Sequence, residues 1–341
     1  MKLYRVVILV LISTYSAVGL ALPTARITIR VVDETGLPVA GANAGLVLEA
    51  PKKKGEGWGT DTSWVPGLTD AEGLFSGEGE TASYVSLSAK KDGYYDVSSH
   101  FNDFTGVSGF LGFRKYEPWN PTVEMVLKKK VNPVAMYAVN MFGTKSEDYP
   151  QLPLLGRFVG FDIMANDWIV PYGLGTHADF LFKVDVERAI SNTDHDVTLT
   201  LQFSNKGDGL IEYTPDIRKG KSGLRLPYHA PTSGYEAEFN KKYDNVPGVL
   251  KYSAGGNPEY DTNYFFRVRT QLDKEGLVTG GLYGKIHGDI SLGNYAWLHT
   301  QKPYVVFDYY LNPNINDTNI EFDPDKNLFK NLPELQQVKN P

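Results

Sequence analysis

The sequence predicts an all-β chain in which a small β-sandwich precedes a larger antiparallel β-sandwich or jelly roll. Three observations lead to this expectation. The 341 residues include 21 Tyr, 17 Phe, 34 Gly and 20 Pro, a composition typical of strands and tight turns. Apolar and polar residues alternate over short stretches, as they do in half-buried strands. Turn sequences rich in Gly and Asp separate these stretches.

Residues 1–21 have the pattern of a secretory signal peptide. Lys2 and Arg5 precede a short apolar stretch, and Gly19 and Ala21 are small residues at the expected cleavage site. Hydroxyl residues interrupt the apolar stretch too early for a membrane span, and no later segment is long enough to be one. We therefore expect a secreted, periplasmic or cell-surface protein with no membrane span after removal of the signal.

The charge and the lack of cysteine exclude several functions. Loss of Lys2 and Arg5 with the leader changes the formal charge from -6 to -8, because all 40 acidic residues remain. An acidic chain without a basic patch is not expected to bind nucleic acid or anionic lipid. With no cysteine the exported chain has no disulfides, so core packing must stabilise its domains.

Residues 22–130 are expected to form the small sandwich. Ile27, Ile29 and Val31 alternate with polar residues, and the turn that ends at Gly36 leads into the next strand. Further strands and turns are expected at 69–75, 83–89, 91–95 and 123–127. The insertion 98–121, rich in Phe and Gly, is either a functional loop or a packing surface against the next domain.

Three motifs lie within residues 33–94. They are Asp33, Gly36, Pro38 and Gly41 in the first strand and turn, Thr69-Asp70 with Gly73-Leu-Phe75, and Lys91-Asp-Gly93-Tyr94. Together they resemble the carboxypeptidase regulatory-like, transthyretin-like β-sandwich module, over about 100 residues. This family is a stabilising or docking module on many unrelated proteins, so the resemblance implies a fold and export rather than an activity.

Residues 131–341 are expected to form the larger sandwich with an extended C-terminal tail. Three lysines at 128–130, followed by Pro133, mark the boundary. Strands are expected at 136–141, 157–163, 178–186, 197–203, 235–239, 264–272, 281–292 and 304–311, with a weak helical turn at 186–191. A bulge at Gly280–Gly281 would bring Arg267 and Arg269 onto the same face as Tyr283 and Lys285.

Further segments, spread over most of the chain, resemble a family of exported bacterial proteins with the same two-part layout and no assigned activity. These segments are Glu117–Pro121, Asp167-Trp168, Pro171–Gly173, His177–Phe180, Phe203–Asn205, Gly207–Gly209, Tyr283–Ile286, Tyr309–Pro313, Asn316-Asp317 and Glu321–Asp323. The resemblance implies an architecture and a shared surface.

The most distinctive polar pattern lies on the strand at 281–292. Tyr283, Lys285, His287 and Asp289 alternate with apolar residues and glycines, and Arg267 and Arg269 are expected alongside. A cation, an aromatic ring and an acid on one solvent-exposed face could all contact the same ligand. The alternative is a cross-strand ladder of ion pairs that only makes the sheet soluble.

Two His-x-Asp pairs, His177 with Asp179 and His287 with Asp289, could bind a metal or act as acid and base, or could be ordinary hydrogen-bonded pairs. The oxygen-rich run 312–323 offers calcium ligands at alternate positions but is equally explained by a chain of Asx turns. We expect no cofactor, with calcium as the alternative. No His-x-x-Glu, Gly-x-Ser-x-Gly or phosphate-binding loop occurs, so peptidase activity is not inherited from the small module.

The tryptophans complete the candidates. Trp58, Trp64, Trp119, Trp168 and Trp297 lie in or beside Gly-, Pro- or Asn-containing loops, where rings either stack on sugars or close the end of a sandwich.

The sequence therefore favours a noncatalytic binding or scaffolding protein of the cell envelope, whose partner is a polysaccharide or another envelope protein. The alternative is a carbohydrate-active or other hydrolase. Its carboxylates would be residues such as Asp162, Asp167 and Asp179.

Overall fold

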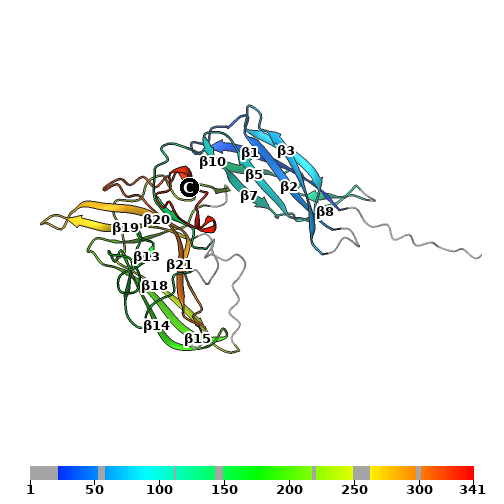
Figure 1. Ribbon diagram of the computed structural model, residues 1–341. Helices are drawn as coiled ribbons and strands as arrows, with labels where there is room; N and C mark the ends of the chain where they lie inside the picture. The colour runs from blue at the N-terminus through cyan, green and yellow to red at the C-terminus, as the bar shows by residue number, and fades with distance from the viewer. Residues whose placement is uncertain are drawn as a thin grey trace, which may run out of the picture. The chain divides into compact units, whose positions relative to one another are not determined.

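The computed structural model describes residues 22–52, 58–110, 113–142, 149–216, 220–248, 262–296 and 301–341. The expected signal peptide and Trp297 lie outside these ranges. The chain forms two compact units: the described residues of 22–89 and 98–125 make the first, and those of 90–97 and 126–341 make the second (Figure 1). Their ordered elements are strands and two short 3-10 turns, which confirms the all-β prediction. None of the described segments is a helix of the length and apolar character that a membrane crossing needs.

The described residues of the first unit form nine strands, and the last of these strands continues into the second unit. They are β1 (Thr24–Asp33), β2 (Asn43–Pro51), β3 (Thr60–Leu68), β4 (Leu74–Glu80), β5 (Val85–Lys90), β7 (Val97–Phe101), β8 (Gly106–Ser108), β9 (Lys115–Glu117) and β10 (Thr122–Lys129). One sheet has the order β10-β1-β9-β8 with β4 paired to β1, and the other has the order β7-β5-β2-β3. The unit is therefore a two-sheet sandwich.

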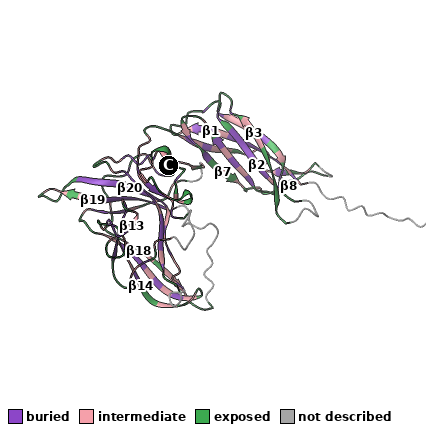
Figure 2. Cartoon of the chain, viewed as in Figure 1, coloured by how far each residue is buried: buried purple, intermediate pink, exposed green. Residues whose placement is uncertain are grey.

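The core of the first unit follows the alternation of the sequence. Ile27, Ile29 and Val31 of β1 are fully buried, as is Leu46 of β2 (Figure 2). Gly77 of β4 lies against the side chain of Leu46, so the two sheets approach closely where no side chain intervenes. The expected insertion 98–121 contains β7, β8 and β9 rather than a long loop.

The second unit is the larger sandwich. Its strands are β6 (Tyr94–Tyr95), β11 (Tyr137–Val139), β12 (Val159–Asp162), β13 (Asp167–Trp168), β14 (Phe180–Ser191), β15 (Asp194–Phe203), β16 (Gly209–Tyr213), β17 (Lys221–Ser222), β18 (Glu238–Asn245), β19 (Asn263–Leu272), β20 (Val278–Gly293) and β21 (Tyr304–Leu311). Two 3-10 turns, η4 (Pro324–Lys326) and η5 (Glu334–Gln336), follow. One sheet has the order β11-β21-β20-β19-β16 and the other β13-β12-β14-β15-β18.

A core rich in phenylalanine joins these two sheets. Phe180 and Phe182 of β14 meet Phe266 of β19 and Phe307 of β21, with ring centroids 5.3 to 5.7 Å apart across the sandwich. Such ring pairs add about 0.5–1.5 kcal/mol each to the burial of their area. The two sheets are thereby fixed face to face.

The sheet that contains β20 is covered on its other face as well. A second apolar cluster joins Phe265, Tyr283 and Tyr310 of this sheet to Ile320 and Phe322 of the C-terminal segment. Within the described residues the unit thus has three layers: two sheets and a layer of irregular chain.

Glu321 fixes this covering layer. Its carboxylate accepts hydrogen bonds from the Tyr95 hydroxyl (2.7 Å) and from the backbone N–H groups of Val131 (2.8 Å) and Asn132 (2.6 Å). The carboxylate is only 1% exposed, so these three donors replace the water that it loses.

The structure corrects three expectations about the strands. The weak helical turn at 186–191 is wrong, because β14 continues to Ser191 and pairs with β15 along this stretch. The strand expected at 235–239 runs from Glu238 to Asn245. The short strands β13, β16 and β17 were not expected, since two to five residues carry too little alternation to be recognised.

The register of the hairpin of β19 and β20 is irregular where the sequence predicts it, beside Gly280–Gly281, but the extra residue there lies on β19. Arg267 pairs with Tyr283, so these two side chains share a face as expected. The pairing is interrupted at Arg269 and Thr270 of β19, where Arg269 has φ +55°, and again between Gly280 and Val278 of β20. The bulge therefore turns Arg269 out of the common row.

Candidate functional site

Tyr283, Lys285 and His287 share one face of β20, but this face is buried. Lys285 is completely shielded from solvent and His287 is 7% exposed. The apolar side chains that belong to the covering cluster are Leu226, Ala230, Ile320, Phe322 and Val338. The expectation of a solvent-exposed face is wrong, because segments distant in sequence cover this side of the sheet.

The two bases on this face have unusual surroundings. The Lys285 Nζ lies 4.6 Å from the centre of the Tyr310 ring and has no hydrogen-bond partner among the described residues. Burial, followed by repulsion from Lys128, lowers the pKa of Lys285 to about 7. Burial and the charge of Lys285 also lower the pKa of His287, whose Nε2 has no partner either. These side chains are internal and cannot contact a ligand in the described conformation.

Arg267 and Arg269 donate to partners other than these bases, and the two arginines have different partners. The Arg267 guanidinium is buried and donates to the carbonyl oxygens of Gly207 (Nε, 3.0 Å) and Thr232 (2.9 Å). Its carbon Cζ lies 4.7 Å from the centre of the Tyr235 ring. Arg267 is thus fully engaged in holding loops to the edge of the sheet.

Arg269 joins the two sheets through two buried carboxylates. It donates to both oxygens of Asp179 (2.8 Å each) and to Asp162 (3.1 Å). Burial alone would raise the pKa of Asp162, but backbone N–H donors, those of Thr176 and His177 first, together with Arg269, outweigh burial and lower it. Asp162 and Asp179 are therefore a structural ion cluster and do not face an open groove, as the hydrolase alternative requires.

The pair of His177 and Asp179 does not form. His177 is largely exposed and contacts the hydroxyl of Thr176 through Nδ1 (3.0 Å), whereas Asp179 is 2% exposed and bound to Arg269. Both residues precede β14, and the Asp179 N–H bonds back to the His177 carbonyl (3.0 Å). The expectation that they share a face assumed an extended strand, which this turn excludes.

The pair of His287 and Asp289 is separated in the same way. Gly288 between them has φ +74°, and the register of β20 shifts there. Asp289 accepts from the hydroxyl of Tyr264 (2.8 Å) and forms an ion pair with Lys241 of β18. It therefore belongs to the seam between the two sheets rather than to the His287 face.

Trp168 closes one end of the sandwich. It is 5% exposed, and its ring makes edge contacts with Phe161 (5.3 Å) and Phe182 (6.0 Å). Trp64 is different: it is half exposed, and its ring lies directly over Gly45 of the neighbouring strand, where a Cβ would come within 2.1 Å of it. Trp58 is fully exposed.

The oxygen-rich run 312–323 is a chain of Asx turns. The side-chain oxygens of Asn312, Asp317 and Asn319 each accept from the backbone N–H two residues later, at 2.9 to 3.0 Å. In the part of the chain that the structure describes, no three His, Asp or Glu side chains are arranged to hold a metal ion. The Asx-turn interpretation therefore accounts for the run.

The best candidate for a binding site lies on the outer face of the sheet that contains β14, β15 and β18. This open groove has a volume of about 770 Å³. Its polar floor consists of Lys183, Asp185 and Glu187 of β14, Thr198, Thr200 and Gln202 of β15, and Glu238 and Asn240 of β18. These polar side chains point outward because successive side chains of a strand alternate between its two faces. The neighbouring residues, such as Val184 and Leu199, point into the core.

Strand register sets the floor residues opposite one another. Lys183 pairs with Thr200, which pairs with Asn240, and Gln202 pairs with Glu238. The Thr200 hydroxyl donates to Asn240 Oδ1 (2.8 Å), and the amides of Asn240 and Gln202 donate to the two oxygens of Glu238 (2.6 Å each). Amides and hydroxyls are thus held in fixed positions on a rigid sheet.

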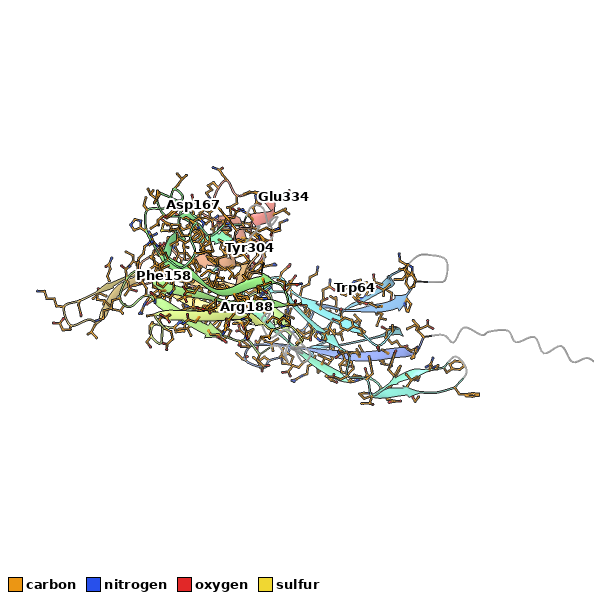
Figure 3. All side chains as sticks on the ribbon, turned by 90° about the horizontal axis from the view of Figure 1, so that it is seen from below. Trp64, Phe158, Asp167, Arg188, Tyr304 and Glu334 are labelled. Carbon is orange, nitrogen blue, oxygen red and sulfur yellow. The ribbon has the colours of Figure 1, made fainter. Side chains whose placement is uncertain are left out.

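A short loop forms the wall of the groove. Leu155, Gly156 and Phe158 line it, and the Gly156 N–H donates to the Val184 carbonyl (2.9 Å), which holds the loop along the edge of β14. Phe158 is 39% exposed beside the green strands (Figure 3). Its ring lies 5.2 Å from the Lys183 Nζ. The groove therefore combines a polar floor with an aromatic wall.

The groove is acidic. Lys183 is its one lining cation and is paired with Asp185 (2.8 Å), whereas Glu187 and Glu238 add two further carboxylates. Hydrogen bonds from Asn240 and Gln202 lower the pKa of Glu238, so that this carboxylate stays ionised at neutral pH. The charge disfavours anionic ligands.

Sequence reasoning missed this groove. Each strand alone reads as an ordinary half-buried strand, and the wall comes from a loop that carries no motif. The one usable signal was the alternation at 181–187 and 198–202, which sets Lys183, Asp185, Thr198, Thr200 and Gln202 outward.

Comparisons with known proteins show no family. No protein-family model matches the chain, and no curated protein matches it. Among solved structures, a chain from Bacteroides uniformis described as a candidate carbohydrate binding protein is 12% identical, with a TM-score of 0.15, over 86% of this chain and 99% of that chain. A similarity at this level carries no argument about function.

Proposed function

We propose that this protein is an exported, noncatalytic carbohydrate-binding protein whose groove takes a stretch of neutral polysaccharide. The observation that carries the proposal is the floor of ordered amides, hydroxyls and carboxylates on β14, β15 and β18, with the exposed ring of Phe158 beside it. Sugar hydroxyls both donate and accept, as this floor does, and the C–H face of a sugar packs on an aromatic ring.

The charge of the groove supports a neutral ligand. An acidic polysaccharide would meet the carboxylates of Glu187 and Glu238 with no unpaired lining cation to receive it. An open sheet surface also suits a chain that extends beyond the site, whereas small molecules usually bind in concave pockets that bury most of their surface.

The test is a glycan array with the mature protein, with and without calcium, followed by calorimetry with soluble neutral polysaccharides such as glucan, xylan and mannan, and with alginate as the anionic comparison. Asn240→Ala and Phe158→Ala are each expected to weaken binding of the neutral chain about tenfold. Asn314→Ala and Phe113→Ala replace exposed residues of the same types elsewhere and should leave affinity unchanged.

Preference for alginate, or equal affinity of Asn240→Ala and the unchanged protein for the bound neutral chain, would reject the groove as the site.

We further propose that the first unit is a carboxypeptidase regulatory-like module that supports the second. The motifs at residues 33–94 and the two-sheet sandwich architecture favour this assignment.

A further inference from the structure

A second, smaller cavity lies in the second unit and shares no lining residue with the groove. Its volume is about 220 Å³. It is lined by Met141, Tyr149, Pro150, Gln151, Phe161, Asn166, Asp167, Trp168 and Gln336. Drug-sized ligands need roughly 300–1,000 Å³, so this cavity suits a single small ring.

The turn between β12 and β13 gives the cavity rigid walls. The Asp162 carboxylate accepts from the backbone N–H groups of Met164 (3.0 Å) and Ala165 (3.1 Å), which fixes the turn. Asn166 completes it with φ +53°, and the buried Tyr309 hydroxyl donates to the Ile163 carbonyl (2.6 Å). The position of Asn166 is therefore set before any ligand arrives.

Asp167 is held just as firmly. One carboxylate oxygen accepts from the Trp168 N–H (2.7 Å) and the other from the Leu174 N–H (2.8 Å). Figure 3 labels Asp167 in the second unit. Its charge is thus anchored by the loop that follows β13, while Asp167 itself remains part of the cavity wall.

The residues that line the cavity have a mixed chemistry. Tyr149, Phe161 and Trp168 are aromatic, and Gln151, Asn166 and Gln336 carry side-chain amides. The Asn166 Oδ1 accepts from the Tyr309 hydroxyl (3.3 Å). Within the part of the chain that the structure describes, the indole N–H of Trp168 has no hydrogen-bond partner. An anionic ligand would be repelled by Asp167, and none of the described residues that line the cavity is a cation that would offset this repulsion. A wholly apolar ligand would displace water from the three amides without offering them hydrogen bonds, which is unfavourable.

We propose that this cavity binds one neutral sugar ring, either a free monosaccharide or the terminal residue of a glycan. A sugar ring offers C–H surface to aromatic carbon and hydroxyls to amides and a carboxylate, and it matches the small volume. The inference extends the proposed carbohydrate binding to a second site.

The experiment uses the mature full chain and a panel of methyl glycosides of glucose, galactose, mannose and N-acetylglucosamine. Binding is followed by saturation-transfer NMR and by titration of amide chemical shifts. Asn166→Gly removes the side-chain amide and keeps a residue that accepts positive φ. Asn316→Gly is the matched control, because Asn316 also has positive φ (+63°) and lies outside the cavity.

At least one methyl glycoside is expected to bind, with affinity lowered about tenfold by Asn166→Gly and by Gln336→Ala, and unchanged by Asn316→Gly and by the groove variant Asn240→Ala. If Asn166→Gly alters the near-ultraviolet circular dichroism of the fold, Gln336→Ala decides. Polysaccharide binding in the groove with no methyl glycoside binding would overturn this inference and leave the proposed function standing. Loss of glycoside binding in Asn240→Ala alone would also overturn it, since the sugar would then occupy the groove.

Discussion

Lys285 shows what burial does to a single side chain. Its amine is enclosed between β20 and the covering layer, where the face of the Tyr310 ring and the charge of Glu321 compensate only in part for the loss of water. Enclosure lowers the pKa of Lys285 to about 7, so near neutral pH the folded protein holds a substantial fraction of this amine uncharged. Folding therefore releases a proton that the unfolded chain would keep.

This proton release predicts a rise in stability with pH. Between about pH 7 and pH 9 the unfolded chain binds more protons at residue 285 than the folded chain, so the free energy of unfolding increases with pH. At higher pH the buried tyrosines, whose pKa values burial raises, give the opposite slope. Above pH 7, Asp308, whose pKa burial raises to about 6, no longer titrates. Lys285→Met should remove this slope and stabilise the protein at neutral pH by about 1–4 kcal/mol. Urea unfolding at several pH values measures both effects, and Lys302→Met, which replaces an exposed lysine, is the control. If the free energy of unfolding rises equally steeply with pH in Lys285→Met and in the unchanged protein, the argument is wrong.

Substitution of Arg269 should destabilise the protein, whereas substitution of Lys285 should stabilise it. Arg269→Met leaves the carboxylates of Asp162 and Asp179 buried without their cation, which should cost about 3–5 kcal/mol at pH 7. Because the folded pKa of Asp162 is lowered, its contribution is present above about pH 4 and is lost as the pH falls through the folded value. The deficit of the variant should therefore shrink in acid.

The matched variant is Arg188→Met, which removes a more exposed pair with Asp194 and should cost about 0–1 kcal/mol. Denaturant unfolding of both variants provides the comparison. Equal losses from the two substitutions would show that the Arg269 cluster contributes no more than a surface pair.

At the scale of one element, β20 depends on its glycines for two different reasons. Gly284 lies beneath the Phe266 ring, where a Cβ would come within 2.1 Å of Cζ and 2.5 Å of the Tyr310 carbonyl oxygen. Gly288 has open space around it and is needed for its positive φ at the bulge.

Gly284→Ala should therefore destabilise the protein by about 1–3 kcal/mol, because the sheet must shift to admit a methyl group. Gly106→Ala in β8 is the control, since no atom lies within 4 Å of the position that its Cβ would take. Thermal unfolding of the two variants tests the difference; similar melting temperatures would contradict the packing argument.

The same strand shows how far sequence reasoning reaches. Alternation correctly sets Tyr283, Lys285 and His287 on one face and Leu282 and Ile286 on the other. It cannot show whether the polar face meets water, because the cover comes from residues near 226 and 320. A floor spread over three strands, as in the groove, is likewise invisible to a reading of one strand at a time.

At the scale of the whole molecule, the division into units makes a further prediction. A fragment of residues 22–130 should fold, because β1, β2 and β5 have a buried core of their own. Tyr94 and Tyr95 belong to the second unit, and the Tyr95 hydroxyl lacks its acceptor Glu321 in the fragment, so this segment should be less protected there. Amide hydrogen exchange followed by NMR distinguishes these regions, and an unfolded fragment would refute the division.

The sequence predicts two sandwiches from local patterns of strands and turns, and the described residues form two compact units. The boundary expected after residue 130 differs from the unit boundary inside β10, since β10 contributes its first half to one unit and its end to the other. A strand that is continuous in sequence gives no sign of this change of partners.

The hydrogen bonds of Glu321 have a consequence for the order of folding. The donors at Tyr95, Val131 and Asn132 precede their acceptor by 226, 190 and 189 residues. During synthesis these donors cannot form their hydrogen bonds until residue 321 has been made. Until then the face of the sheet that carries Tyr310 is not covered by the C-terminal segment. Contacts of such long sequence separation form slowly. The first unit can therefore fold while the chain is still growing, but the second can be completed only after residue 321 has been made.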